Sequence, residues 1–97
     1  MGKKGYTYIL TNINHTVLYT GVTSNLPQRM EEHRVGKYKS SFTHRYNVTI
    51  LVYFEERSSI LDAIAREKQI KAGSSQKKLD LINGQNPEWR DFTEELR

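Results

Sequence analysis

The stretch that decides the fold is Tyr19-Thr20-Gly21, followed by Asn25-Leu26-Pro27-Gln28-Arg29-Met30-Glu31-Glu32-His33. Asn25 is a good N-cap, Pro27 is tolerated in the first helical turn, and Gly36 can end the helix. These signals predict a helix over about residues 26–35. Because Tyr19-Thr20-Gly21 resembles the end of a strand, the stretch predicts a strand that leads into a short helix.

The inward face of this predicted helix carries two charged or titratable side chains. On a 3.6-residue period the inward positions are Leu26, Arg29, Met30 and His33, whereas Gln28, Glu31 and Glu32 face water. Unpaired buried charge is costly, so Arg29 and His33 on such a face favour a functional site. The alternative is that both side chains extend from the rim of the apolar stripe into solvent.

Three segments have the composition of β-strands. Residues 6–11 alternate, with Tyr6, Tyr8 and Leu10 on one face, and a turn leads to an antiparallel strand over residues 16–20. Residues 48–54 are nearly all apolar or β-branched, which predicts a strand covered on both faces at the centre of a three-stranded sheet. We therefore expect an α+β fold, a small, mainly antiparallel sheet flanked by helices.

Glu67 is the least expected residue in the chain. Ser59 and Asp62 predict the start of a helix and Gly73 predicts its end. Glu67 projects from the middle of the apolar stripe of this helix, which consists of Ile60, Ala63, Ile64 and Ile70. A carboxylate on a buried face favours a functional role over a packing role.

The last quarter of the chain has the pattern of two further helices. The first covers residues 75–82, and the second opens at Asn86 and Pro87 by the N-cap and N-terminal proline rule. Apolar residues of both helices are spaced to pack on the body of the protein.

Residues 37–47 interleave cations with aromatic rings and show no helical or strand period. Such a loop can hold phosphates with its cations and stack a base on a ring. The cations are Lys37, Lys39 and Arg45, and the candidate rings are Tyr38 and Phe42. The alternative is a solvated loop that Phe42 and Tyr46 anchor in the core.

Size and composition restrict the function further. The 97 residues, 1–97, are expected to form a single domain, and the lack of cysteine excludes disulfides and thiolate-bound metals. The net charge is +4, and residues 84–97 are acidic on balance, so the basic charge lies with the motif residues. This balance favours a phosphate-rich partner. We see no signal peptide or membrane span in the sequence and expect a soluble, cytoplasmic protein.

Together these features resemble the GIY-YIG nuclease family. The resemblance rests on an ordered set: Tyr8, Tyr19-Thr20-Gly21, Arg29 ten residues after Tyr19, His33 one helical turn later, and the distal Glu67. It extends from Gly5 to Trp89. Tyr6-Thr7-Tyr8 occupies the place of the Gly-Ile-Tyr motif, and Tyr8 is assigned as its tyrosine from its distance to Tyr19.

The resemblance implies a metal-dependent endonuclease that hydrolyses phosphodiester bonds, with DNA favoured over RNA. By the same resemblance Glu67 holds a single divalent ion, Mg²⁺ or Mn²⁺, Arg29 binds the scissile phosphate, Tyr8 is the general base and Tyr19 orients the water. His33 would assist as a proton relay or a phosphate contact. A phenol has a pKa near ~10, so His33 becomes the base if the site cannot lower that of Tyr8.

Two other functions remain open from the sequence. One is a catalytically inactive nucleic-acid-binding module that keeps the basic surface. The other is a protein-interaction domain in which Glu67 and Arg29 form a buried ion pair. Metal-dependent cleavage separates the nuclease from both.

Overall fold

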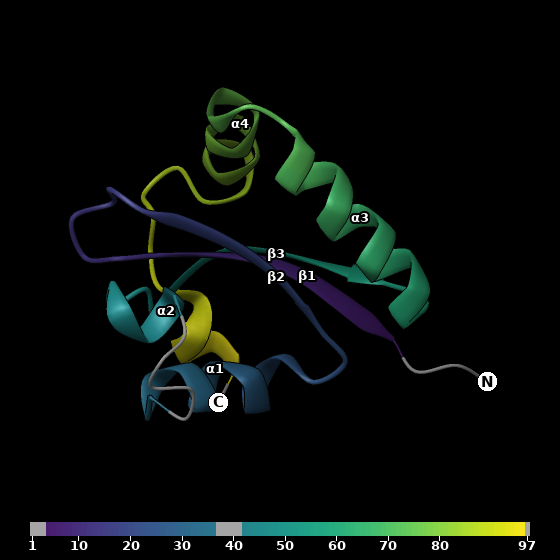
Figure 1. Cartoon of the computed structure of the whole chain (residues 1–97), viewed down its shortest axis with the longest axis horizontal. Coiled ribbons are helices and arrows are strands. Elements are labelled where there is room, and N and C mark those ends of the chain that lie inside the picture. The colour runs from purple at the N-terminus through teal and green to yellow at the C-terminus, as the bar shows by residue number, and fades with distance from the viewer. Residues whose placement is uncertain (1–3, 37–41, 97) are drawn as a thin grey trace.

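A three-stranded antiparallel sheet separates two layers of helices (Figure 1). The computed structural model describes residues 4–36 and 42–96. Its elements are β1 (Gly5–Thr11), β2 (Leu18–Thr23), α1 (Leu26–Arg34), α2 (Phe42–Arg45), β3 (Ile50–Arg57), α3 (Ile60–Ala72), α4 (Ser75–Gln85) and the 3₁₀ helix η1 (Phe92–Leu96). α1, α2 and η1 lie on one side of the sheet, and α3 and α4 lie on the other. The expected α+β fold is confirmed.

The central strand is β1, because the sheet order is β2-β1-β3. The prediction that the strand near residues 48–54 is central is therefore wrong. β3 is nevertheless apolar because helices cover both of its faces, and its residues Leu51 and Val52 are fully buried. Apolar composition reports burial of the two faces and does not distinguish a central strand from a covered edge strand.

Side chains from the C-terminal segment form hydrogen bonds with the backbone groups on the outer edge of β3. Asp91 accepts from the backbone N–H of Leu51, and Gln85 both accepts from the N–H of Phe54 and donates to its carbonyl. The Asn86 side chain donates to the carbonyl of Val52. Asn86 thus forms a hydrogen bond with the edge of the sheet and is not the N-cap of a further helix. The predicted helix from residue 87 is replaced by a turn and by η1, whereas α4 continues to Gln85. Capping the edge with side chains prevents its pairing with another chain.

Alternate residues of β1 enter two different hydrophobic cores, as their spacing predicts. Tyr8 and Leu10 pack with Leu26 and Met30 of α1 on one face of the sheet. Ile9 packs on the other face with the α3 and α4 side chains Ile70 and Ile82. The face that holds Tyr8 is therefore the face that α1 covers.

The helix caps form where the sequence predicts them. The Asn25 side chain accepts from the N–H of Gln28, and the Ser59 hydroxyl accepts from the N–H of Asp62. Gly36 follows α1 with a φ of +70°, which suits a glycine that ends a helix. β2 differs from its predicted span of 16–20, since it begins at Leu18 and continues past Gly21 to Thr23.

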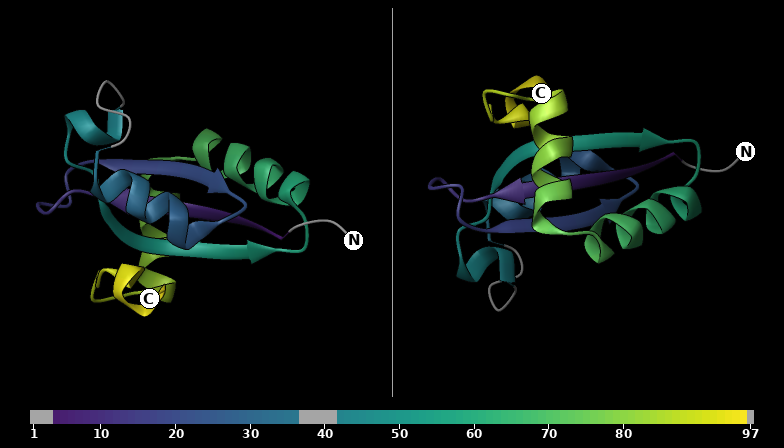
Figure 2. Two further views of the ribbon diagram at one scale, coloured as in Figure 1. Left: turned by 90° about the horizontal axis from the view of Figure 1, so that it is seen from below. Right: turned by 90° about the horizontal axis from the view of Figure 1, so that it is seen from above.

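α3 is placed toward the β2 side of the sheet, and α4 crosses over the strands (Figure 2). Residues of α3 can therefore approach the free edge of β2. Over the described ranges 4–36 and 42–96, no helix is long and apolar enough to cross a membrane.

Candidate active site

Tyr8 is fully buried, and its ring lies against the backbone of Gly21 on β2. A Cβ atom at Gly21 would lie 2.5 Å from both Cζ and the hydroxyl oxygen of Tyr8. Only a residue without a side chain leaves room for the phenol at this point. The glycine of the Tyr19-Thr20-Gly21 motif therefore creates the space through which Tyr8 reaches its hydrogen-bonding partner.

That partner is His33, which α1 places on its buried face. The Tyr8 hydroxyl lies 3.3 Å from His33 Nε2, and His33 Nδ1 lies 3.1 Å from the hydroxyl of Thr43 on α2. If Nδ1 carries the proton and donates to Thr43, Nε2 accepts from Tyr8; the other tautomer reverses both roles. Each nitrogen of the imidazole therefore has a hydroxyl partner.

Tyr19 completes an aromatic group around this pair. Its ring centroid lies 6.5 Å from that of Tyr8 and 6.1 Å from that of His33. Phe42 stacks on Tyr19 with 6.2 Å between the ring centroids, and Tyr46 packs on Phe42. Phe42 and Tyr46 are 50% and 45% exposed, so the expectation that they anchor a loop in the core is wrong. They extend the aromatic surface outward from Tyr19.

Arg29 lies at the rim of the same site and pairs with Glu32, its Nε being 3.2 Å from Glu32 Oε1. The Glu32 side chain is only 15% exposed, which corrects the prediction that Glu32 faces water. The correction follows from helix geometry, since residues three apart are neighbours and Arg29 holds Glu32 against the protein. The site therefore contains a carboxylate that the 3.6-residue period of the helix assigned to solvent.

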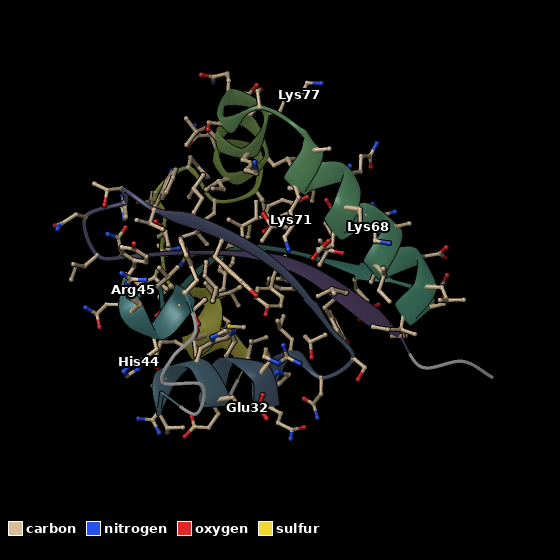
Figure 3. All side chains as sticks on the ribbon, viewed as in Figure 1. Glu32, His44, Arg45, Lys68, Lys71 and Lys77 are labelled. Carbon is tan, nitrogen blue, oxygen red and sulfur yellow. The ribbon has the colours of Figure 1, made fainter. Side chains whose placement is uncertain are left out.

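Glu67 belongs to α3, in the helix layer on the opposite side of the sheet from Arg29. Its side chain is 14% exposed and its Oε2 lies 3.0 Å from Nζ of Lys71. The Lys71 ammonium lies 5.9 Å from the centroid of Tyr19, so Lys71 connects α3 to the edge of the aromatic group. Figure 3 shows Lys71 directed from α3 over β2.

The structure thus brings Tyr8, Tyr19, Arg29 and His33 together, and it joins Glu67 to them through Lys71. The alternative of a buried Glu67–Arg29 ion pair is wrong, because each of these residues pairs with another one on its own helix.

The environment shifts the pKa values of Tyr8 and His33 in opposite directions. Burial, reinforced by the charge of Tyr19, raises the pKa of Tyr8 to about 12, although the charge of Arg29 and its hydrogen bond to the phenol oppose the rise. Burial and the charge of Arg29 lower the pKa of His33, and Glu32 partly opposes that. At neutral pH Tyr8 is therefore a protonated phenol and His33 is a neutral imidazole.

Glu67 fits a metal ion that takes few ligands from the protein. No cluster of three or more His, Asp or Glu side chains suited to a metal occurs in the described part of the chain. Mg²⁺ is commonly held by one or two carboxylates and completes its shell with water and substrate phosphate oxygens. A single, partly exposed carboxylate at the edge of the site meets that requirement.

The predicted nucleic-acid contacts are only partly described. Arg45 lies on α2, in a segment predicted as a loop, and its guanidinium stacks over Tyr46 at 5.7 Å. Arg45 is exposed and faces solvent near the aromatic surface (Figure 3). Lys37 and Lys39 lie outside the described residues.

Sequence reasoning missed Thr43, Glu32 and Lys71. The spacing of Glu67 and Lys71, four residues apart on one helix, is a signal for their ion pair, and Arg29 and Glu32 are similarly spaced. No pattern in the sequence points to Thr43, because its contact with His33 depends on how α2 folds back onto α1.

Two tyrosines, a histidine and an arginine thus meet on the face of the sheet that α1 covers. A family model described as the GIY-YIG catalytic domain matches residues 4–80. The chain belongs to the GIY-YIG family. It is 44% identical over 85 residues to a UPF0213 protein of Syntrophus aciditrophicus, an alignment that covers 88% of this chain and 95% of the relative. A UPF0213 protein of Staphylococcus haemolyticus is 39% identical over 79 residues, with 81% and 94% covered.

A solved structure has the same fold. The solution NMR structure of a UPF0213 protein from Bacillus halodurans superposes with a TM-score of 0.57 at 26% identity, and the match covers 94% of this chain and 95% of the other. The GIY-YIG fold is that of nucleases in general, and nucleic acid is the partner that this class of domain suggests.

Proposed function

We propose that this protein is a metal-dependent endonuclease that hydrolyses phosphodiester bonds in DNA. The observation that carries the proposal is the 3.3 Å contact between the Tyr8 hydroxyl and His33 Nε2, with Arg29 beside it. A protonated phenol next to a neutral imidazole forms a path for a proton, and a guanidinium at its rim suits a phosphate.

Arg29 binds the scissile phosphate. Its pairing with Glu32 holds the guanidinium at the rim, and a third of its side chain is exposed, so it remains accessible to a substrate. Arg45, Lys37 and Lys39 contact flanking phosphates, and Phe42 and Tyr46 offer exposed rings for a splayed base. Each neutralised phosphate adds about −0.9 to the slope of log affinity against log salt on duplex DNA.

Once substrate binding has made the buried phenol accessible to the attacking water, Tyr8 takes the proton of that water while it passes its own proton to His33. The raised pKa of Tyr8 disfavours a tyrosinate formed in advance, so the two transfers occur together. This route requires the tautomer in which Nδ1–H donates to Thr43 and Nε2 is free to accept. Tyr19, next to both groups, orients the water.

Glu67 holds a single Mg²⁺ or Mn²⁺ ion, whose charge when bound stabilises the developing negative charge and the leaving oxygen. This metal role is supported by the position of Lys71, which pairs with Glu67 and reaches the ring of Tyr19.

The test is a cleavage assay of the whole chain on supercoiled, single-stranded and branched DNA and on RNA. We expect cleavage of DNA with Mg²⁺ or Mn²⁺, none with EDTA, and cleavage by Tyr8→Phe that is about 10²- to 10⁴-fold slower. Tyr6→Phe is the matched control, because it removes a phenol hydroxyl from the same strand that bonds only Glu56 among the described residues. Cleavage of RNA alone would contradict the DNA assignment.

The second candidate is a catalytically inactive nucleic-acid-binding module. The basic charge and the exposed rings beside Arg45 favour it, since they serve binding without chemistry. Salt-dependent binding to DNA without cleavage under any metal condition would establish this function in place of the nuclease.

A further inference from the structure

Lys71 is in contact with two parts of the candidate site at once. Its ammonium lies 3.0 Å from Glu67 Oε2 and 5.9 Å from the centroid of Tyr19. The side chain is 54% exposed, whereas that of Glu67 is 14% exposed. A cation that water can reach therefore sits on a carboxylate that is mostly covered.

This position makes Lys71 a competitor of any metal ion. A carboxylate that holds Mg²⁺ or Mn²⁺ offers the same oxygens that the ammonium occupies, and two cations beside one carboxylate repel each other. Metal binding at Glu67 thus displaces Lys71. The flexible four-carbon stem of lysine lets the ammonium swing away at little cost, because water reaches the lysine side of the pair and screens the attraction.

The displaced ammonium remains tethered at the site. The Lys71 side chain passes over Tyr19, and Tyr19 contacts His33 and Tyr8. A phosphate held by Arg29 would lie within this group of residues. A free ammonium there is a phosphate ligand, since lysine binds phosphate as a mobile point charge.

We propose that Lys71 is a metal-controlled phosphate ligand: it pairs with Glu67 in the metal-free protein and moves to a substrate phosphate when a divalent ion takes its place. This inference rests on the proposed metal role of Glu67. It makes metal binding and nucleic-acid binding cooperative. The metal binds Glu67 and the phosphate binds Lys71, so either ligand breaks the ion pair and leaves the other residue available for the second ligand.

The first measurement is the affinity of the metal-free whole chain for Mn²⁺. Binding is detected by the electron paramagnetic resonance signal of the unbound ion. Lys71→Met should bind Mn²⁺ about two- to fivefold more tightly than the wild type, as expected when a weak exposed ion pair no longer competes. Lys68→Met is the matched control, since it removes the same charge from an exposed position of the same helix. Its Mn²⁺ affinity should stay near that of the wild type.

The second measurement is the affinity for a short DNA duplex, with and without Mn²⁺, in a Tyr8→Phe background that leaves the duplex intact. The factor by which Mn²⁺ strengthens DNA binding should shrink severalfold in Lys71→Met and be retained in Lys68→Met. Lys71→Arg keeps the charge and should retain most of that factor.

The outcomes separate this inference from the function on which it rests. Mn²⁺ affinity and DNA coupling that are the same in Lys71→Met and Lys68→Met would overturn the role of Lys71 and leave the nuclease proposal intact. Mn²⁺ binding that Glu67→Gln does not weaken would overturn both the metal role of Glu67 and the inference.

Discussion

The Tyr8 hydroxyl lies 3.3 Å from His33 Nε2, and the two groups have pKa values displaced in opposite directions. Burial causes both displacements, because it disfavours the tyrosinate and the imidazolium alike. A charged pair formed in advance is therefore unfavourable, and the site keeps both groups neutral until a proton moves. Tyr8 and His33 act as one acid–base unit in this arrangement. The hydroxyl of Thr43 holds the other ring nitrogen, His33 Nδ1, by a hydrogen bond.

Replacing Tyr8 by Phe removes the hydroxyl and leaves the ring packed in the core. We expect cleavage to fall by about 10²- to 10⁴-fold, the usual contribution of a positioned proton-transfer group. The free energy of unfolding should fall by about 1 to 3 kcal/mol, because the bonds of the phenol to His33 and Arg29 are lost and the buried His33 Nε2 loses its partner. A cleavage assay and a urea denaturation curve on the same preparation measure both effects.

Tyr6→Phe should keep its cleavage activity, which tests the assignment of Tyr8 as the motif tyrosine. Cleavage retained by Tyr8→Phe but lost in His33→Ala would instead make the imidazole the base that acts directly on water.

Gly21→Ala should damage the site through Tyr8. The new Cβ would lie 2.5 Å from the phenol, whose ring is held by the core, so either the ring or β2 must move. Overpacking of this kind costs about 1 to 3 kcal/mol, and a displaced hydroxyl loses its contact with His33. We expect a lower melting temperature together with a strong loss of cleavage.

Gly84→Ala is the matched control, because no atom of the described residues lies within 4 Å of a Cβ at this position of α4. It should stabilise the helix by roughly 0.5 to 1 kcal/mol and leave cleavage unchanged. Normal cleavage by Gly21→Ala would mean that Tyr8 tolerates displacement and that its hydroxyl position is not decisive.

The contacts that the sequence predicts well are those set by local periodicity. Arg29 and His33 lie one turn apart on one helix, and the alternation of β1 puts Tyr8 on the face that this helix covers. The caps at Asn25 and Ser59 likewise depend on residues three positions away. These features need no knowledge of the tertiary fold.

Contacts between distant segments were not predictable in the same way. Whether β3 is central or at an edge depends on Gln85, Asn86 and Asp91, which satisfy its outer backbone groups and leave no trace in the composition of β3 itself. The Thr43–His33 contact and the position of Lys71 over Tyr19 also arise only when separate elements pack together.

Thr20→Val should stabilise the protein. The Thr20 hydroxyl is buried and has no hydrogen-bond partner among the described residues, and the side chain faces away from Tyr8, on the side of Ile9. Removing an unsatisfied buried hydroxyl while keeping the shape should gain about 1 kcal/mol or more. Thermal denaturation measures the gain, and cleavage should not change. A loss of stability would indicate that the hydroxyl is in fact bonded.

Glu67→Gln tests the metal role against a structural one. The partner of Glu67 is a Lys71 that is mostly open to water, so losing the pair should cost less than about 1 kcal/mol. Cleavage should nevertheless vanish, and Mg²⁺ should not raise the melting temperature of this variant, whereas we expect it to raise that of the wild type. Thermal melts with and without Mg²⁺ check this. A destabilisation of several kcal/mol with no effect of Mg²⁺ on the wild type would defeat the metal assignment.

The shifted pKa values give stability a defined pH dependence. His33 has a folded pKa below its ordinary 6.5, so the unfolded chain binds more protons below that pH and His33 should lower the stability as the pH falls. Tyr8 has a folded pKa of about 12, above its ordinary value of 10. Its protonated phenol therefore stabilises the folded state below pH 10, and this stabilisation is lost as the pH rises from 10 through about 12. In Tyr8→Phe the free energy of unfolding should fall by roughly 2 to 3 kcal/mol less over this alkaline range than it does in the wild type. Denaturation curves across the pH range measure both slopes.

The pH profile of cleavage distinguishes the two ways in which Tyr8 could act. If His33 receives the proton, kcat/KM should rise as His33 becomes neutral, with an apparent pKa below 6.5, and then stay level. If Tyr8 must ionise first, kcat/KM should rise about tenfold per pH unit toward the pKa of about 12 and show no plateau near neutrality. Because Thr43 is the acceptor for His33 Nδ1–H in the first route, Thr43→Val should lower the plateau. A profile that still climbs steeply between about pH 8 and 10 would reject transfer to His33 and require another group to lower the pKa of Tyr8.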